Sequence, residues 1–138
     1  MKWVFADSGA WYAHLVEEDA DHESAVRIFK QGLKERWQLI TTNAVVFETH
    51  ALLLNRARDG RNLALGFLND IDSGLCHVER VTRRDEEQAV QLLWTHIDKD
   101  YSLCDALSFV VMERLDAETV VAFDKHFYQY GRFTVLSA

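Results

Sequence analysis

The sequence predicts an α/β sandwich with a mainly parallel β-sheet, and three observations support this fold class. Short apolar runs alternate with longer segments of helical periodicity along the chain. The apolar runs are rich in Val, Ile, Leu and aromatic residues, which is typical of strands buried on both faces of a parallel sheet. No linker or internal repeat interrupts the alternation, so a single domain over residues 1–138 is predicted.

Five short apolar segments are expected to form the strands. In chain order they are residues 2–6, 38–41, 76–81, 120–123 and 133–136. Helical patterns occupy the intervals between them, as the crossover connections of a parallel sheet require.

Helical periodicity marks five longer segments. They are residues 21–37, 43–58, 62–71, 85–97 and 104–115. The first of them carries an apolar stripe made of Ala25, Ile28, Phe29 and Leu33. The second and third are expected to form a helical hairpin, which is broken at the turn-forming pair Asp59 and Gly60.

Composition narrows the function classes. An apolar content of 49% and a charged content of 27% are typical of a soluble globular domain. The longest apolar runs reach about a dozen residues, too few to span a bilayer, and the N-terminus lacks a signal-peptide core. Cys76 and Cys104 are too isolated for a disulfide framework or a cysteine zinc site. A cytoplasmic protein without membrane association is therefore expected.

The net charge bears on the choice of partners. A formal charge of −7 argues against a protein that coats nucleic acid in general. It still permits a locally basic rim, for which Arg56, Arg58 and Arg61 form one candidate cluster.

Four acidic residues lie where carboxylates are costly or unusually placed. Asp7 and Asp124 each follow a strand candidate, which places them at the carboxyl ends of strands, where open α/β sheets bind ligands. Glu48 lies on the apolar face of segment 44–54, and Asp105 begins an apolar helix. No lysine or arginine lies within four positions of Asp7 or Asp105, or within seven of Glu48. Acids without nearby cations indicate a divalent metal ion held by oxygen ligands.

Three of these acids also have purely structural explanations. Asp7 is placed to cap the helix that follows it, and Asp124 to end a strand by accepting hydrogen bonds from turn amides. Ser102 and Asp105 have the spacing of a capping box. Taken singly, each of the three fits capping at least as well as metal binding.

Glu48 is harder to explain structurally, because a glutamate on an apolar helix face is rarely buried without a partner. A distant cation such as Arg114 is the alternative partner. Four independent coincidences remain a weaker explanation than one shared site.

Four segments resemble the motifs of a known family. They are Asp7-Ser8-Gly9-Ala10, Glu48 in the third helix, Ser102-Leu103-Cys104-Asp105-Ala106-Leu107-Ser108-Phe109, and Ala122-Phe123-Asp124-Lys125-His126-Phe127. In order, spacing and chain length they resemble the motifs of PIN-domain nucleases, and most of all those of the VapC toxins of toxin–antitoxin pairs. The chain departs slightly at Gly9, where Ser or Ala is also common, and at Cys104, where Thr is more usual. Neither departure is expected to touch a ligand.

The resemblance implies a fold, an activity and partners. The fold is a three-layer α/β/α sandwich, and the activity is metal-dependent endoribonuclease cleavage. By this resemblance the metal-binding acids are Asp7, Glu48, Asp105 and Asp124, and the ion is Mg²⁺ or Mn²⁺. It also implies an RNA substrate, a homodimer and a VapB-like antitoxin that enters the acidic groove. Residues 21–37 and 43–71 are the expected antitoxin-facing segments.

Phosphodiester cleavage explains the need for these acids, because a bound divalent ion lowers the pKa of its water and neutralises the attacked phosphate. We expect Asp7, Glu48 and Asp105 around the principal ion. Asp124 is expected to help bind a second ion or to orient the attacking water. The nearby Asp98 and Asp100 are reserve acids, which we expect in a solvated loop instead.

Aromatic and histidine side chains near the motifs are further candidates. Trp11, Tyr12 and Tyr101 flank the acids and are candidates for stacking on RNA bases, although core packing is expected for at least one of them. Surface or locally bonded states are expected for the histidines in general. His126 is the exception to test, because it follows the fourth acid.

Two other function classes compete with the ribonuclease. A Mg²⁺-dependent α/β phosphohydrolase usually has a second Asp two positions after the first, where this chain has Gly9. A catalytically idle PIN-like module would use its acids to contact a basic partner protein and would bind metal weakly or not at all. Metal titration, and a comparison of RNA with small phosphate esters, separate the three.

Overall fold

The computed structural model describes residues 2–138, and its centre is a five-stranded sheet. The strands are β1 (Trp3–Ala6), β2 (Gln38–Thr42), β3 (His77–Glu79), β4 (Thr119–Val121) and β5 (Thr134–Leu136). Their order across the sheet is β3-β2-β1-β4-β5, and each neighbouring pair is parallel. Phe5 in β1 is in register with Ile40 of β2 and Val120 of β4. The predicted parallel sheet is confirmed.

In the described part of the chain, seven helices lie between these strands. They are α1 (Ser8–Leu15), α2 (His22–Glu35), α3 (Asn43–Arg56), α4 (Gly60–Asp72), α5 (Arg83–Thr95), α6 (Leu103–Arg114) and α7 (His126–Tyr130). The short helix α7 is not among the segments expected from the sequence. Within residues 2–138, no helix combines the length and apolar character needed to cross a membrane.

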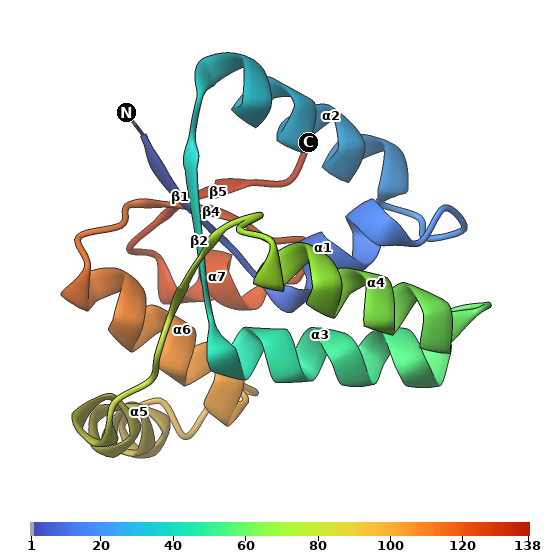
Figure 1. Ribbon diagram of the computed structural model, residues 1–138. Coiled ribbons are helices and arrows are strands. Elements are labelled where there is room, and N and C mark those ends of the chain that lie inside the picture. The colour runs from blue at the N-terminus through green and yellow to red at the C-terminus, as the bar shows by residue number, and fades with distance from the viewer. Residues whose placement is uncertain (1) are drawn as a thin grey trace.

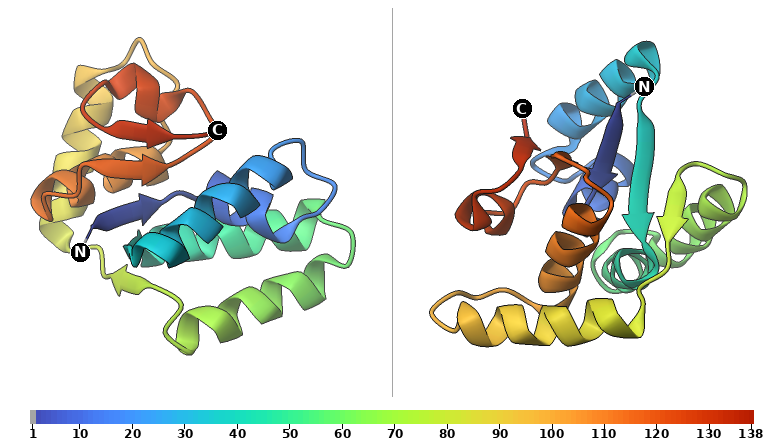
Figure 2. Two further views of the ribbon diagram at one scale, coloured as in Figure 1. Left: turned by 90° about the horizontal axis from the view of Figure 1, so that it is seen from above. Right: turned by 90° about the vertical axis from the view of Figure 1, so that its left-hand side faces the viewer.

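The strand order determines how the helices are layered. The connections through α1 to α4 step across the sheet in one direction, and those through α5 to α7 step back in the other. Because parallel crossovers are almost always right-handed, the two groups of helices cover opposite faces. In Figure 1, α1 to α4 lie to the right of the strands, whereas α5 and α6 lie to the left; Figure 2 gives two further views. The predicted three-layer α/β/α sandwich is confirmed.

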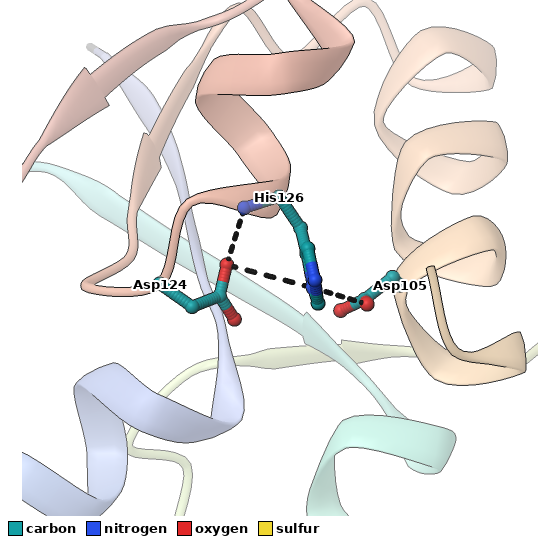
Figure 3. A group of neighbouring side chains, drawn as sticks. All are labelled: Asp105, Asp124 and His126. Atoms are coloured by element: carbon teal, nitrogen blue, oxygen red, sulfur yellow. Dashed lines mark hydrogen bonds and ion pairs between the residues drawn. The ribbon is translucent and has the colours of Figure 1, made fainter. Parts of the chain in front are cut away.

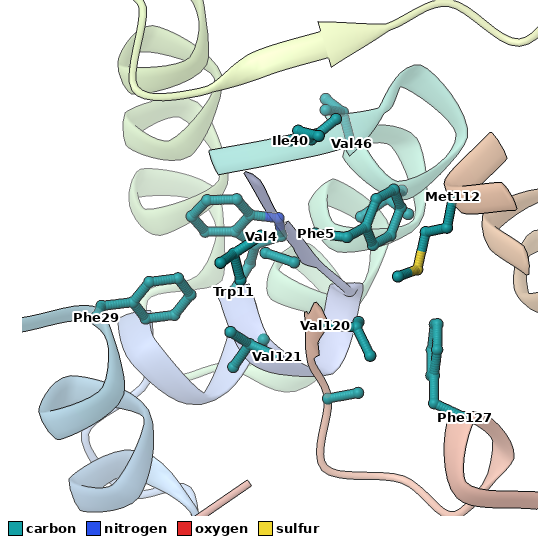
Figure 4. Packing of buried hydrophobic residues seen from close by; sticks show 14 of the residues in the cluster. Val4, Phe5, Trp11, Phe29, Ile40, Val46, Met112, Val120, Val121 and Phe127 are labelled. Atoms are coloured by element: carbon teal, nitrogen blue, oxygen red, sulfur yellow. The ribbon is translucent and has the colours of Figure 1, made fainter. Parts of the chain in front are cut away.

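The hydrophobic core centres on the middle strand β1 and its neighbour β4 (Figure 4). Phe5 of β1 and Val120 of β4 are fully buried, and Trp11 of α1 stacks on Phe29 of α2 with ring centroids 5.3 Å apart. The edge strands β3 and β5 have exposed and half-buried positions instead. Burial on both faces is therefore correct for the centre of the sheet but wrong for its edges, which have a neighbour on one side only.

The predicted apolar stripe of α2 is wrong at Leu33. The other three residues of the stripe are buried, but Leu33 is 82% exposed. The buried residue in this turn is Gly32, on which the Trp37 ring lies so closely that a Cβ at Gly32 would be 2.6 Å from Cε3 of Trp37. Trp37, beyond the end of the helix, therefore packs on Gly32, whereas the neighbouring Leu33 lines an open apolar cavity.

The predicted hairpin of α3 and α4 is confirmed, and Gly60 makes its close approach possible. A Cβ at Gly60 would lie 2.2 Å from the carbonyl oxygen of Leu53, which is backbone and has little freedom to move. Gly60→Ala is therefore expected to reduce the free energy of unfolding by at least ~1–3 kcal/mol in urea titrations. Gly66→Ala, in the same helix, is the matched control, because a Cβ there meets nothing within 4 Å. It should leave stability unchanged or raise it by up to about 1 kcal/mol, and an equal effect of both variants would contradict the packing argument.

Candidate metal centre

The predicted acids gather at the carboxyl ends of β1 and β4, where the strand order reverses. Asp7 directly follows β1, and its amide donates a hydrogen bond to the carbonyl of Val121 at the end of β4 (3.1 Å). Asp124 lies three residues beyond Val121. Crevices at such reversal points are where open parallel sheets bind ligands, so the fold itself places these two acids at a site.

Asp7 is almost completely buried, with 2% exposure, and it precedes the first turn of α1. Its side chain forms no capping hydrogen bond, so the capping explanation fails for this acid. Burial raises the pKa of Asp7 well above its ordinary value, and the negative charges of Asp124 and Asp105 raise it further. The environment of Asp7 therefore resists a negative charge unless a cation is added.

Asp105 has the predicted capping-box geometry. Its amide donates to Oγ of Ser102, and its Oδ2 accepts from the Ser102 amide, both at 3.0 Å. The same Oδ2 lies 2.7 Å from Nδ1 of His126. Burial raises the pKa of Asp105, although the Ser102 amide and His126 act in the opposite direction. Capping and membership of the acidic cluster are therefore compatible: the cap fixes the carboxylate at the site.

Glu48 is half-buried on α3 and accepts a hydrogen bond from Oγ of Ser8. Apart from its position next to Asp7, nothing in the sequence pattern indicates a role for Ser8. Cys104 also lies beside Glu48: burial raises the pKa of the Cys104 thiol, and the charge of Glu48 raises it further. The position at which the chain departs from the family pattern is therefore close to one of the predicted acids.

The alternative partner for Glu48 is wrong as well, because Arg114 binds other acids. Arg114 donates to both carboxylate oxygens of Asp85, at 3.0 and 2.8 Å, and to Glu79 at 2.8 Å. Burial by itself raises the pKa of Asp85, but hydrogen bonds from Arg114 and Thr82 outweigh it and the pKa is lowered. This buried acid, which the sequence patterns do not reveal, pairs with a protein cation, whereas within residues 2–138 Asp7 pairs with no lysine or arginine.

Asp124 and His126 complete the cluster. Oδ1 of Asp124 accepts a hydrogen bond from the His126 amide (2.9 Å), as the turn explanation predicts. Its side chain is 44% exposed and so reaches solvent. Figure 3 shows the tightest group, in which one potential ligand atom each from Asp105, Asp124 and His126 lie within 4.8 Å of one another. Asp7 and Glu48, which the structure also describes, are not part of this group.

The donor set fits a divalent cation. Of the ion pairs formed within residues 2–138, none joins Asp7, Glu48, Asp105 or Asp124 to a lysine or arginine. Carboxylate oxygens and an imidazole nitrogen are ligands for divalent metals, and a cation would relieve the repulsion that raises the pKa of Asp7.

Comparison with known proteins decides the family. The sequence matches the PIN domain over residues 4–133. The chain belongs to the PIN-domain family.

Within this family the chain is a homologue of the VapC toxins. It is 34% identical over 128 residues to the 23S rRNA-specific endonuclease VapC20 of two Mycobacterium tuberculosis strains, covering 93% of this chain and 94% of the relative. The crystal structure of M. tuberculosis VapC20, described as a Sarcin-Ricin loop cleaving toxin, matches with a TM-score of 0.85 and 32% identity over 94% of this chain and 95% of that one. The resemblance drawn from the four motifs is confirmed.

Two more distant structures show the fold alone. VapBC2 from Rickettsia felis, bound to a DNA fragment from its promoter, matches with a TM-score of 0.69 at 10% identity. FitAcB from Neisseria gonorrhoeae matches with a TM-score of 0.66 at 12% identity. Each match covers 96% of both chains.

A groove lies beside Asp124 in this PIN domain. It has a volume of about 290 Å³ and is lined by Gly9, Tyr12, Asp19, Asp21, Leu52, Arg56, Phe123 and Asp124. Of the predicted aromatic candidates, Trp11 and Tyr101 are buried in the core, and only Tyr12 is half-buried and lines this groove. Of the three predicted arginines, all exposed, only Arg56 lines it.

The reserve acids lie outside the cluster, in the exposed loop that precedes α6. Asp98 forms an ion pair with Lys99 at 3.2 Å, and Asp100 is exposed. The predicted solvated loop is confirmed.

Proposed function

We propose that this PIN-domain protein is a divalent-metal-dependent endoribonuclease and the toxin of a toxin–antitoxin pair. One observation carries the proposal: buried acids that pair with no lysine or arginine within residues 2–138 lie at the reversal point of the sheet, in a chain 34% identical to a 23S rRNA-specific endonuclease. Asp7, Glu48, Asp105 and Asp124 are the proposed metal-binding residues, and Mg²⁺ or Mn²⁺ the proposed ion.

In this proposal, some residues hold the metal-binding carboxylates in position and another orients the attacking water. The bound ion supplies charge neutralisation at the attacked phosphate and a water of lowered pKa. Ser8 holds Glu48 through its hydroxyl, and the Ser102 amide holds the carboxylate of Asp105. The carboxylate of Asp124, which reaches solvent, would orient the attacking water. Both buried acids lie on rigid elements, at the start of α1 and in the first turn of α6, so little reorganisation is needed.

The direct test is cleavage of RNA by the purified protein. Because the VapC20 relative acts on 23S rRNA, ribosomes and isolated 23S rRNA are the first substrates to examine. We expect discrete cleavage products with Mg²⁺ or Mn²⁺ and none with EDTA. Release of phosphate from small esters without RNA cleavage would favour the phosphohydrolase. An absence of both, together with no metal binding in calorimetry, would favour the idle binding module.

The groove beside Asp124 is the proposed path for RNA. Tyr12 and Phe123 offer aromatic surface for a base, and Arg56 has no ion pair within residues 2–138 and offers its guanidinium to a phosphate.

Arg56→Ala tests this path. We expect it to weaken RNA binding by about tenfold, measured by fluorescence anisotropy in EDTA, because a hydrogen bond to a charged group is lost. Arg58→Ala is the matched control, since Arg58 is also exposed and close in sequence but does not line the groove. Equal losses in the two variants would mean that only general charge matters.

The remaining parts of the proposal concern the context of the enzyme. We infer one catalytic domain over residues 1–138, a homodimer, a cytoplasmic location and a VapB-like antitoxin. We further propose α2 and the α3–α4 hairpin as the antitoxin-facing elements. An apolar cavity of about 350 Å³, lined by residues that include Trp11, Phe29, Leu33 and Phe67, supports α2 and α4 in this role, whereas no residue of α3 lines it. Co-purification with the product of a neighbouring reading frame would test this partner.

A further inference from the structure

The metal centre contains a nitrogen atom that a four-acid site does not use. Nδ1 of His126 lies 2.7 Å from Oδ2 of Asp105 and 3.9 Å from Oδ1 of Asp124 (Figure 3). This nitrogen is shielded from solvent, and within residues 2–138 no atom meets it with hydrogen-bond geometry. A buried polar atom without a hydrogen bond is destabilising, so Nδ1 requires a partner.

A simple ion pair with Asp105 does not satisfy this requirement. A protonated imidazole gains most when its N–H points at the carboxylate, which gives a short, charge-assisted hydrogen bond. Here the atoms are 2.7 Å apart, but the ring is not aimed at the oxygen. Adjacent ligands of an octahedral ion with bonds of about 2.1 Å are roughly 3 Å apart, and the two separations lie on either side of this value. Nδ1 and one oxygen of each carboxylate are thus close enough together to share one ion.

Two contacts hold the imidazole in this position. The His126 amide donates to Oδ1 of Asp124 at 2.9 Å, which fixes the turn that begins α7. The ring packs edge-on against the buried ring of Tyr101, with centroids 5.6 Å apart and planes at 85°. Fixing a ligand by its backbone and by its ring limits the motion that metal binding would otherwise have to suppress.

We propose that His126 binds the divalent ion of this site directly through Nδ1, and that this nitrogen ligand makes the site prefer Mn²⁺ to Mg²⁺. The inference rests on the proposed function, since it needs an ion at Asp105 and Asp124. Carboxylates alone suit both ions, whereas imidazole suits transition metals better than Mg²⁺. The preference for Mn²⁺ would therefore come from His126, which follows the turn after β4.

Pulsed electron paramagnetic resonance of the Mn²⁺-loaded protein tests the proposal without relying on activity. The wild type should show modulation from a directly bound ¹⁴N, which is replaced by ¹⁵N modulation after histidine labelling. His126→Phe keeps the ring packing on Tyr101 and should lose the modulation. Its dissociation constant for Mn²⁺ should rise by at least ~10–100-fold, as for loss of a supporting partner of a metal ligand, with a smaller change for Mg²⁺.

Two further variants secure the interpretation. His96→Phe is the matched control, because His96 also packs on Tyr101, at 5.8 Å, but is outside the ligand group; it should keep the nitrogen signal. His126→Asn offers an amide oxygen near the position of Nδ1 and should bind Mn²⁺ without the modulation, which keeps the test valid if His126→Phe does not fold.

The failures of the two proposals are distinguishable. Mn²⁺ that binds in an Asp105-dependent manner without ¹⁴N modulation in the wild type, or with modulation that persists in His126→Phe, would overturn the role of His126 and leave the metal centre standing. An absence of Mn²⁺ binding, or binding unaffected by Asp105→Asn, would overturn both.

Discussion

Asp7→Asn and Asp105→Asn are each expected to abolish RNA cleavage while the protein remains folded. The substitutions remove a negative charge and almost no volume, so packing is retained and the lost interaction is with the metal ion. A loss of several kcal/mol of charge stabilisation corresponds to a reduction in rate of at least about a thousandfold. Glu48→Gln should behave in the same way. Asp124→Asn should be impaired less severely, because its carboxylate is partly exposed and water can replace it.

The measurement is the rate of appearance of the RNA cleavage product under single-turnover conditions, with folding checked by circular dichroism. Asp100→Asn is the control, because Asp100 is exposed and lies outside the cluster; it should cleave at the wild-type rate. Near-normal cleavage by the Asp7 or Asp105 variant would contradict a mechanism that depends on a metal ion bound by these acids. In cells, expression of the wild type should arrest growth and these variants should not. Lack of arrest by an active wild type would count against the toxin role alone.

The second large effect is metal-dependent stability. The folded-state pKa of Asp7 is raised by burial and by Asp124 and Asp105. Between its unfolded and folded pKa values, the folded protein therefore binds more protons than the unfolded chain. The stabilising contribution of Asp7 is fully present below the unfolded pKa of about 3.9 and is lost as the pH rises through the folded pKa. Without metal, stability should accordingly fall as the pH rises from the acidic range toward neutrality.

Metal should reverse this loss at neutral pH. Free Mn²⁺ at 100 times its dissociation constant should add about 2.7 kcal/mol to the free energy of unfolding. For a chain of this length that is a rise in melting temperature of roughly 10 °C. Asp7→Asn should be more stable than the wild type in EDTA, should lack the pH dependence and should respond weakly to Mn²⁺. Asp7 serves this test better than Asp105, because Asp105→Asn also perturbs the capping box of α6.

Thermal unfolding curves in EDTA and in excess Mn²⁺, recorded across the acidic to neutral pH range, would measure these effects. Asp100→Asn again provides the control and should follow the wild type in both conditions. If the wild type shows no metal-dependent shift and Asp7→Asn is no more stable in EDTA, then the acids are not a metal site.

The sequence by itself determined the sheet, its parallel strands and the acids at the carboxyl ends of these strands. These features follow from local patterns: β1 and β4 are apolar runs that each end near an acid, and the helices between them have their own periodicity. Because the strands are parallel, their carboxyl ends all lie at the same end of the sheet, and Asp7 and Asp124 must lie there together. The capping box of Ser102 and Asp105 could also be predicted from the sequence, because it depends on a spacing of three residues within one segment.

Only the tertiary structure decided how side chains from distant segments share partners. From the sequence, Arg114 could pair with Glu48 as well as with Asp85. The packing of α5 on α6 brings it to Asp85, to which it donates two hydrogen bonds. Leu33 fits the apolar stripe of α2, yet it is exposed, and Trp37 packs on the neighbouring Gly32 instead. The contact between His126 and Asp105 joins residues 21 positions apart in sequence on different helices. Such contacts depend on how whole elements pack, and side-chain periodicity, which reports only on a residue's own element, carries no information about them.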